Sequence, residues 1–190
     1  MKLIGSLAIL VSCLLHFTLS DHNQLFCKIP EVRDYYWREY VGVIPYDAVP
    51  GGVDRMGLTT YIGQAMIHPY GELTASIYQG NTTPVASAIK THYVNQNVKI
   101  LCSNSLEKFS WIPTDIDKIQ LITNCHLIVG GVDHGNQENI GRINYDEEIL
   151  LGKVIRLPFE HHGLLVPNNG TETRFTHYEV LAYGCKDKHH

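Results

Sequence analysis

Histidines and acidic residues are the side chains of this sequence that could carry out acid–base or metal chemistry. The candidates are His161, His162 and His177, together with the acidic run at residues 146–148. Adjacent residues of an extended strand point to opposite faces, so His161 and His162 would not both reach one metal ion. The acidic run lacks the spaced oxygen ligands of a Ca²⁺ loop. We therefore interpret these residues as parts of loops or of the surface.

Sequence motifs that mark common enzyme classes are missing from the chain. It contains no Gly-x-Ser-x-Gly elbow, no Walker loop, no dinucleotide-binding fingerprint and no His-Glu-x-x-His pair. Because catalytic triads are defined by geometry, a hydrolase that uses Asp and His side chains remains an alternative. The prediction is a protein that is not an enzyme and that needs no cofactor and no metal.

The composition limits the kinds of partner that the protein can have. Of its 190 residues, 44% are hydrophobic and 18% are charged, and the formal net charge is −4. This composition excludes a disordered or collagen-like chain. A net charge this close to zero, without a long basic run, predicts that neither a nucleic acid nor an anionic membrane is the main partner. The expected ligand is neutral or nearly so.

The N-terminus has the pattern of a secretory signal peptide. Lys2 precedes an apolar run, and we place the cleavage site between residue 20 and Asp21. The run is too short and too interrupted for a membrane anchor, and no later segment resembles a membrane span. Asn81 and Asn169 each begin an Asn-x-Thr glycosylation pattern, which fits the same compartment. The sequence therefore predicts a soluble, secreted, extracellular glycoprotein.

Secretion favours disulfide bonds between the cysteines that remain after cleavage. These are Cys27, Cys102, Cys125 and Cys185. Four cysteines allow three connectivities, which the sequence does not distinguish. Our preferred pairing joins Cys27 to Cys185 and Cys102 to Cys125, with four free thiols as the alternative. A zinc site is disfavoured because the chain has no Cys-x-x-Cys pair.

Short apolar runs separated by Gly, Pro, Asn and Asp fill the rest of the chain, and few of them show the period of a helix. The expected strands lie at residues 41–44, 60–67, 73–78, 86–92, 98–102, 119–122, 126–129, 139–143, 150–157, 163–166 and 175–182. Runs of about four to eight residues at this spacing are typical of an all-β sandwich or barrel.

An internal repeat with a period of about eighty residues organises the sequence. Each copy contains, in the same order, a Trp, a Gly-Gly-Val-Asp tetrapeptide, an Ile-Gly pair and a Cys, at Trp37, 51–54, 62–63 and Cys102 in the first copy and at Trp111, 130–133, 140–141 and Cys185 in the second. The expected fold is all-β, with two tandem pseudo-symmetric repeats that form a β-sandwich-like pair. The expected boundaries are 1–20 for the signal peptide, 21–36 for an N-terminal lead-in, 37–102 and 103–185 for the two repeats, and 186–190 for a tail.

The second copy also carries an Ile-Gly-Arg strand, a Gly-Lys-Val strand, a His-Gly pair and a closing Tyr-Glu-Val-Leu. These stand at residues 140–142, 152–154, 162–163 and 178–181. In this series of motifs the sequence resembles the DM-nine repeat family, and the two copies cover most of the chain after the signal peptide. The first copy follows the family pattern as far as residues 71–73 and then departs from it.

The resemblance implies an all-β, lectin-like fold and the binding of mannose or mannose-containing glycans in pattern recognition, as in innate immunity. Residue by residue, the family's sugar contacts correspond to Asp133 and Lys153 in the second copy. In the first copy Asp54 is present, but the lysine position falls near Ile77, and residues 56–89 contain no Lys or Arg. The resemblance therefore predicts a working site in the second copy and an impaired one in the first, and it allows a homodimer.

Physical chemistry is compatible with such a site and also with simpler roles. An ionised carboxylate accepts hydrogen bonds from two vicinal hydroxyls, and an ammonium group donates to them. Alternatively, the Asp after Gly-Gly satisfies backbone donors within a tight turn, and Lys153 is a solvated strand lysine. A second functional hypothesis is a secreted β module that binds protein or membrane, related to toxin-associated repeats and without sugar binding.

Overall fold

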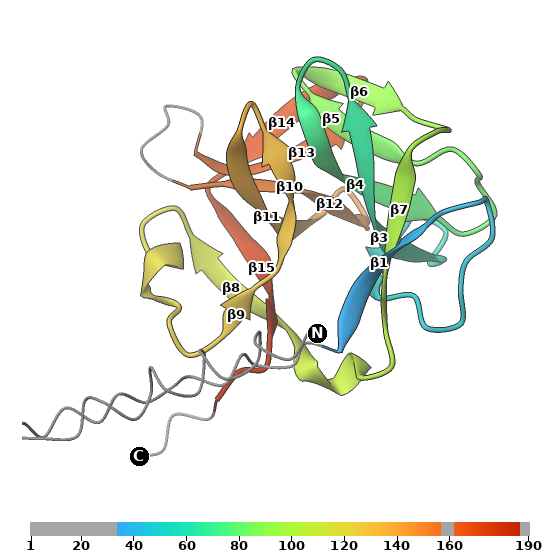
Figure 1. Cartoon of the computed structure of the whole chain (residues 1–190). Helices are drawn as coiled ribbons and strands as arrows, with labels where there is room; N and C mark the ends of the chain where they lie inside the picture. Colours follow the sequence, from blue (N-terminus) through green and yellow to red (C-terminus); the bar gives the residue numbers. More distant parts are fainter. Residues whose placement is uncertain (1–33, 157–161, 187–190) are drawn as a thin grey trace, which may run out of the picture. The chain divides into compact units, whose positions relative to one another are not determined.

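A computed structural model describes residues 34–156 and 162–186 of the chain. Expectations for the signal peptide, Cys27, His161 and most of the lead-in and tail lie outside these residues. Within them the regular structure consists of strands and two short 3-10 helices, which confirms the all-β class (Figure 1). No helix in this part of the chain is long and apolar enough to cross a membrane.

Fifteen strands form one hydrogen-bonded sheet in which the paired strands run antiparallel. The strands are β1 (Tyr35–Glu39), β2 (Pro50–Val53), β3 (Thr59–Ile67), β4 (Gly71–Tyr78), β5 (Val85–Ala88), β6 (Lys90–Tyr93), β7 (Val98–Ser103), β8 (Phe109–Asp115), β9 (His126–Leu127), β10 (Val129–Asp133), β11 (Asn136–Tyr145), β12 (Glu148–Ile155), β13 (Gly163–Asn168), β14 (Thr171–Phe175) and β15 (His177–Tyr183). The 3-10 helices are η1 (Leu106–Lys108) and η2 (Ile119–Leu121).

The order of strands in the sheet follows the sequence repeat. It is β1-β7-β3-β4-β5-β6-β14-β13-β12-β11-β15-β8, so the first six strands come from the first copy and the last six come from the second copy in the reverse arrangement. The two sets meet where Lys90 of β6 pairs with Thr171 of β14. This order supports the interpretation as a tandem repeat, while a pseudo-twofold relation between the copies stays a prediction.

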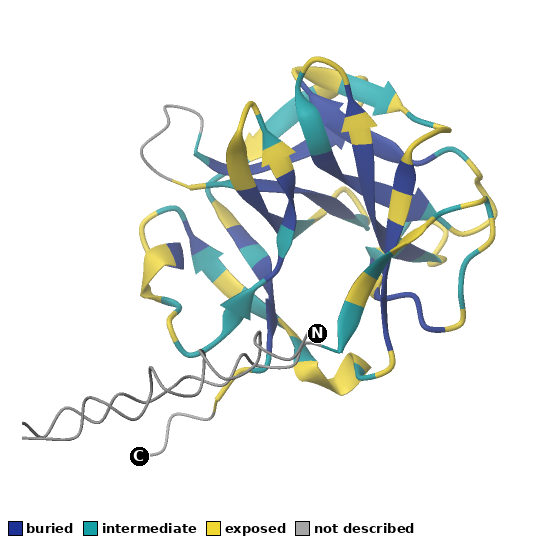
Figure 2. Ribbon diagram, viewed as in Figure 1, coloured by how far each residue is buried: buried dark blue, intermediate teal, exposed yellow. Residues whose placement is uncertain are grey.

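Burial differs between the central strands and the ends of the strand order. Strands β4, β12 and β13 each contain five consecutive buried residues, whereas β1 and β8 are largely exposed or half-buried (Figure 2). The buried stretches of β4 and β12 also contain polar side chains, namely Thr74, Ser76 and Lys153. The sequence predicts the central strands from their Leu, Ile and Val residues, whereas β1 has none of these and β8 has Ile112 alone.

One hydrophobic cluster joins the two copies of the repeat. Its fully buried members are Val49, Ile62 and Leu101 from the first copy and Ile128, Ile140, Leu151, Leu181 and Tyr183 from the second. Trp37 and Trp111, the tryptophans that open the two copies, pack against it. Two further clusters each belong to a single copy. The copies therefore share a core and are not two independent modules.

The Gly-Gly pair of each copy packs closely on a strand of the other copy. A Cβ atom at Gly131 would lie 1.9 Å from the carbonyl oxygen of Glu72 in β4. A Cβ atom at Gly52 would lie 2.6 Å from the Cβ of Ile149 in β12. Only glycine permits an approach this close. The repeated Gly-Gly therefore sets the contact between the copies.

The residue after each Ile-Gly pair also ties the copies together. Gln64 donates from Nε2 to the carbonyl oxygen of Gly130 at 2.8 Å, and Arg142 donates from Nη1 to that of Gly51 at 3.1 Å. Arg142 further donates from Nε to Oε2 of Glu179 at 2.6 Å. The motifs that carry the family resemblance thus include residues that hold one copy against the other.

Several sequence-based expectations for strands are wrong. Residues 41–44 form a largely exposed loop, and residues 119–122 contain η2. Residues 86–92 contain two strands, β5 and β6, because the chain turns at Ile89. The sequence also gives no indication of β1, β2, β8 or most of β14.

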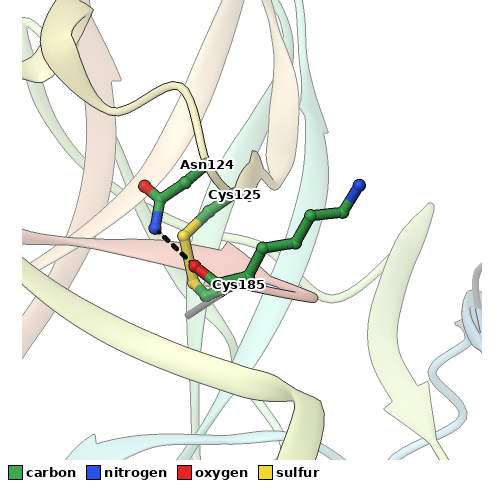
Figure 3. The surroundings of a disulfide bond; sticks show 4 residues. Asn124, Cys125 and Cys185 are labelled. Carbon is green, nitrogen blue, oxygen red and sulfur yellow. Dashed lines mark hydrogen bonds between the residues drawn. A yellow bond between two sulfur atoms is a disulfide. The ribbon is translucent and has the colours of Figure 1, made fainter. Parts of the chain in front are cut away.

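The disulfide bond of the described residues joins Cys125 to Cys185 (Figure 3). Cys125 precedes β9 and Cys185 follows β15, and these two strands pair with each other. Beside the bond, the side-chain amide of Asn124 donates to the carbonyl oxygen of Lys186 at 3.0 Å (Figure 3). The disulfide therefore links the end of β15, the last strand, to the segment that precedes β9.

The disulfide pairing preferred from the sequence is wrong. Cys185 is joined to Cys125 and not to Cys27, and Cys102 is a free thiol. Cys102 lies in β7 with no exposed surface, inside the hydrophobic cluster of the first copy. Burial raises the pKa of its thiol to about 11. Cys27 lies outside the described residues.

Candidate functional site

Asp133 and Lys153 lie 20 residues apart in the sequence and are in direct contact in the structure. Asp133 ends β10 and Lys153 lies in β12, and both strands pair with β11. The register sets Asp133 opposite Asn136 and Lys153 opposite Ile140. Nζ of Lys153 donates to Oδ2 of Asp133 at 2.6 Å. The adjacent strands β10, β11 and β12 therefore bring together the two residues that the family resemblance predicts to contact the sugar.

Lys153 is not the solvated strand lysine that the simpler interpretation expects. Its side chain is only 3% exposed, and its Nζ lies 3.3 Å from Oε2 of Glu172 in β14 as well as against Asp133. Burial by itself lowers the pKa of Lys153, but the hydrogen bond to Asp133 and the charge of Glu172 outweigh it, so the pKa is raised. The group is a fixed ammonium between two carboxylates.

Glu138 is a second buried acid close to this ion pair. It lies in β11, is 1% exposed, and its Oε1 accepts hydrogen bonds from the backbone N–H and the hydroxyl of Thr74 at 2.7 and 3.0 Å. Its Oε2 has no hydrogen-bond partner among the described residues. Burial raises the pKa of Glu138 to about 7, although the bonds from Thr74 and the charge of Lys153 act in the opposite direction. Glu138 therefore carries a proton over part of the neutral pH range.

A pocket of about 370 Å³ opens beside the Asp133–Lys153 pair. One part of its lining is polar and includes Asp133, Lys153, Glu172 and Arg174, and another part is apolar and includes Ala88, Ile89, Ile155 and Leu165. This volume is at the small end of the range for ligand pockets. The volume is large enough for one sugar ring.

His134 forms part of the rim of the pocket. Its Nδ1 lies 2.6 Å from Oδ1 of Asp133, and its ring packs edge-on against Tyr70 with 5.3 Å between the ring centroids. Its backbone N–H donates to the carbonyl oxygen of Tyr70 at 2.8 Å. Tyr70 belongs to the turn between β3 and β4 of the first copy, so both copies contribute to the rim.

The first copy lacks the counterpart of this ion pair. The register of β3 and β4 sets Ile62 opposite Ser76, just as Ile140 stands opposite Lys153, so the matching residue is Ser76 instead of the neighbouring Ile77. The carboxylate of Asp54 instead accepts hydrogen bonds from the N–H groups of Met56 and Leu58, both at 2.9 Å. These contacts are those of a turn-forming aspartate.

Residues 146 and 147 of the acidic run form the turn between β11 and β12, and Glu148 begins β12. Arg55 donates from Nη2 to Asp146 at 2.6 Å and from Nε to Glu148 at 3.3 Å. Asp146 and Glu148 of this run therefore form ion pairs with Arg55 at the surface. No group of three or more His, Cys, Asp or Glu within residues 34–156 and 162–186 is arranged to hold a metal ion. His177 is exposed at the start of β15, and His161 lies outside the described residues.

The two glycosylation patterns lie near each other on the described part of the chain. Asn81 and Asn169 are both exposed and both line a pocket of about 310 Å³. Asn81 accepts a hydrogen bond from the N–H of Thr83 at 2.9 Å, and Asn169 forms the hairpin turn between β13 and β14 with Gly170. Both positions are accessible to modification, and their glycosylation stays a prediction.

Sequence reasoning missed Glu138, Glu172 and His134 in the candidate site. Glu138 lies in β11 between β10 and β12, and Glu172 lies in β14 beside β13, so both reach the ion pair through consecutive strands. Both residues fall outside the strands expected from the sequence at 139–143 and 175–182. His134 directly follows the Gly-Gly-Val-Asp tetrapeptide, and that position could have been included in the motif.

No protein-family model matches the chain, and no curated protein matches it. The fold and the site define an all-β protein with a partly buried Lys–carboxylate cluster at a small pocket. The assignment to the DM-nine repeat family stays a prediction that is based on the motifs.

Proposed function

We propose that the protein is a secreted, lectin-like protein that binds mannose-type glycans in pattern recognition through the pocket at Asp133 and Lys153. The observation that carries the proposal is the 2.6 Å contact between these two residues at a pocket of about 370 Å³. The Cys125–Cys185 disulfide and the composition of the N-terminus support secretion.

The charged side chains of the pocket provide both hydrogen-bond acceptors and hydrogen-bond donors for the vicinal hydroxyl groups of a sugar. Asp133 and Glu172 supply carboxylate oxygens that accept hydrogen bonds, and Lys153 and Arg174 supply charged donors. Because Lys153 is held by two carboxylates, little side-chain entropy is lost when a ligand binds. A pocket for one sugar ring gives modest affinity, so recognition of a glycan surface depends on several sites acting together.

The test is retention of the glycan-trimmed protein on a mannan resin, with elution by free mannose. Asp133→Asn keeps the size of the side chain but removes its charge, and we expect at least about ten-fold weaker mannan binding. Asp54→Asn is the matched control, because Asp54 occupies the same position of the first copy and contacts only its own turn. We expect Asp54→Asn to bind mannan as the wild type does.

Two outcomes would contradict this proposal. If Asp133→Asn is retained as strongly as the wild type, the sugar does not bind at this pocket. If the wild type flows through while its circular dichroism shows a folded β protein, sugar binding is wrong. In that case a β module that binds protein or membrane becomes the better hypothesis, and leakage of liposomes is the next measurement.

A further inference from the structure

Ile89 has a backbone conformation that isoleucine rarely adopts. It connects β5 to β6 with a φ angle of 65°, in the left-handed region. A β-branched side chain is strongly disfavoured there. Ile89 is also 74% exposed, so burial of its side chain in the core does not compensate for the strain. A role outside the stability of the fold is therefore needed to explain this residue.

In the second copy, the hairpin of β13 and β14 stands at the place of the hairpin of β5 and β6, and its turn residues are ones that adopt the left-handed conformation readily. The turn between β13 and β14 contains Asn169 and Gly170, with φ angles of 47° and 83°. Asn and Gly adopt the left-handed conformation readily. The two connections differ in length, because Asn168 pairs with Thr171 across two turn residues whereas Ala88 pairs with Lys90 across Ile89 alone. The first copy thus places one exposed isoleucine where the second has Asn and Gly.

The position of Ile89 is fixed relative to the candidate site. Its carbonyl oxygen accepts a hydrogen bond from the N–H of Glu172 at 3.3 Å, and the neighbouring Thr91 donates from its N–H to the carbonyl oxygen of Gly170 at 3.0 Å. Glu172 is the residue whose carboxylate lies 3.3 Å from Nζ of Lys153. The tip of a first-copy hairpin is thereby attached to the second copy at the pocket.

Ile89 belongs to the apolar part of the pocket lining, and it is the exposed member of that part. Ala88, Ile155 and Leu165 form the rest of this part, and Asp133, Lys153 and Glu172 lie in the polar part. A ligand whose hydroxyl groups bind the polar part has its substituents within reach of Ile89. An apolar substituent there gains free energy by leaving water, whereas a hydroxyl group does not.

We propose that Ile89 is a specificity-determining residue of this pocket and that the preferred ligand is a glycoside with an apolar aglycone, such as a lipid-linked or aryl-linked sugar. This inference rests on the proposed sugar binding at Asp133 and Lys153. The sugar hydroxyls contact the polar cluster, and the aglycone packs on Ile89. The strained turn is retained for this contact.

The experiment compares methyl α-D-mannoside with 4-nitrophenyl α-D-mannoside by titration calorimetry on the full secreted protein. Burial of about 40 Å² of apolar surface strengthens binding about five-fold, so we expect the wild type to prefer the nitrophenyl compound by about that factor. Ile89→Gly, which creates no Asn-x-Thr pattern, is expected to remove this preference and to bind methyl mannoside within about two-fold of the wild type. Because glycine adopts the left-handed conformation without strain, the Tm of Ile89→Gly is expected to stay at or above that of the wild type.

Leu121→Gly is the matched control, because Leu121 is 71% exposed and does not line the pocket. This variant is expected to keep the full preference for the nitrophenyl compound. The inference is overturned if Ile89→Gly binds methyl mannoside and retains the preference, or if its Tm falls, since a fall would show that Ile89 serves stability. If the wild type binds neither mannoside, the proposed function itself fails, which is a different result from an unchanged preference.

Discussion

Replacing Lys153 with methionine is expected to lower the free energy of unfolding by about 4 kcal/mol at pH 8. Methionine fills a similar volume but carries no charge. The Lys153 side chain is 3% exposed and lies against Asp133 and Glu172, whose side chains are 13% and 14% exposed. Without the ammonium these carboxylates repel each other in a poorly solvated site, and the mannan binding of the variant is lost as well.

Urea unfolding at pH 8 measures this effect. Loss of the positive charge leaves the two carboxylates without their counter-ion in a poorly solvated site of the folded state. The control is Lys99→Met, because Lys99 forms an ion pair with Glu72 in which the side chains are 46% and 29% exposed. An exposed pair contributes about 0.5 kcal/mol or less. If both variants are equally stable, the Lys153 cluster is not buried in solution.

Much of the fold could be predicted from the sequence, because the central strands contain closely spaced Leu, Ile and Val residues and the repeat is explicit. The outermost strands were missed for a physical reason. Strand β1 (Tyr-Tyr-Trp-Arg-Glu) and strand β8, which contains Pro113, are exposed on part of their surface and show no apolar alternation. In contrast, residues 119–122 are apolar but pack Ile119 into the core from a 3-10 turn.

The candidate site could be predicted only in part. Asp133 and Lys153 are marked by motifs, whereas the burial of Glu138 depends on its contact with Thr74 of the other copy, 64 residues away. The disulfide pairing failed for the same reason, since it depends on the contact between β9 and β15. Contacts between distant strands are set by how the copies pack, and a local pattern does not report them.

A comparison of the two copies does contain a signal for the buried charges. Glu138 stands opposite Gly131, and the residue in the same place of the first copy is Thr60, opposite Gly52. Lys153 is likewise replaced by Ser76. Thr60 and Ser76 are both buried, so the first copy has neutral residues at both positions where the second has charges. We expect the two positions to change together between the copies, because one buried charge without a partner is strongly destabilising.

The second prediction with a large effect concerns the pH dependence caused by Glu138. Its pKa is about 7 in the folded protein against an ordinary value of 4.5, so the folded state holds the proton more tightly than the unfolded state. Its contribution to stability is therefore complete below pH 4.5 and is lost as the pH rises through 7. Between pH 5 and pH 8 this loss amounts to about 2–3 kcal/mol.

Glu138→Gln isolates this contribution, because glutamine keeps an oxygen that accepts from Thr74 but does not titrate. The free energy of unfolding of the wild type minus that of the variant is expected to fall by about 2–3 kcal/mol from pH 5 to pH 8. The other shifted groups do not interfere in this window. The pKa values of Asp47 and Asp115 are lowered from 3.8 by the hydrogen bonds from Tyr36 and Lys118 respectively, and the pKa of Cys102 is raised by burial to about 11. A constant difference between wild type and variant across the window would show that Glu138 is ionised throughout, and hence that water or a ligand satisfies its Oε2 in solution.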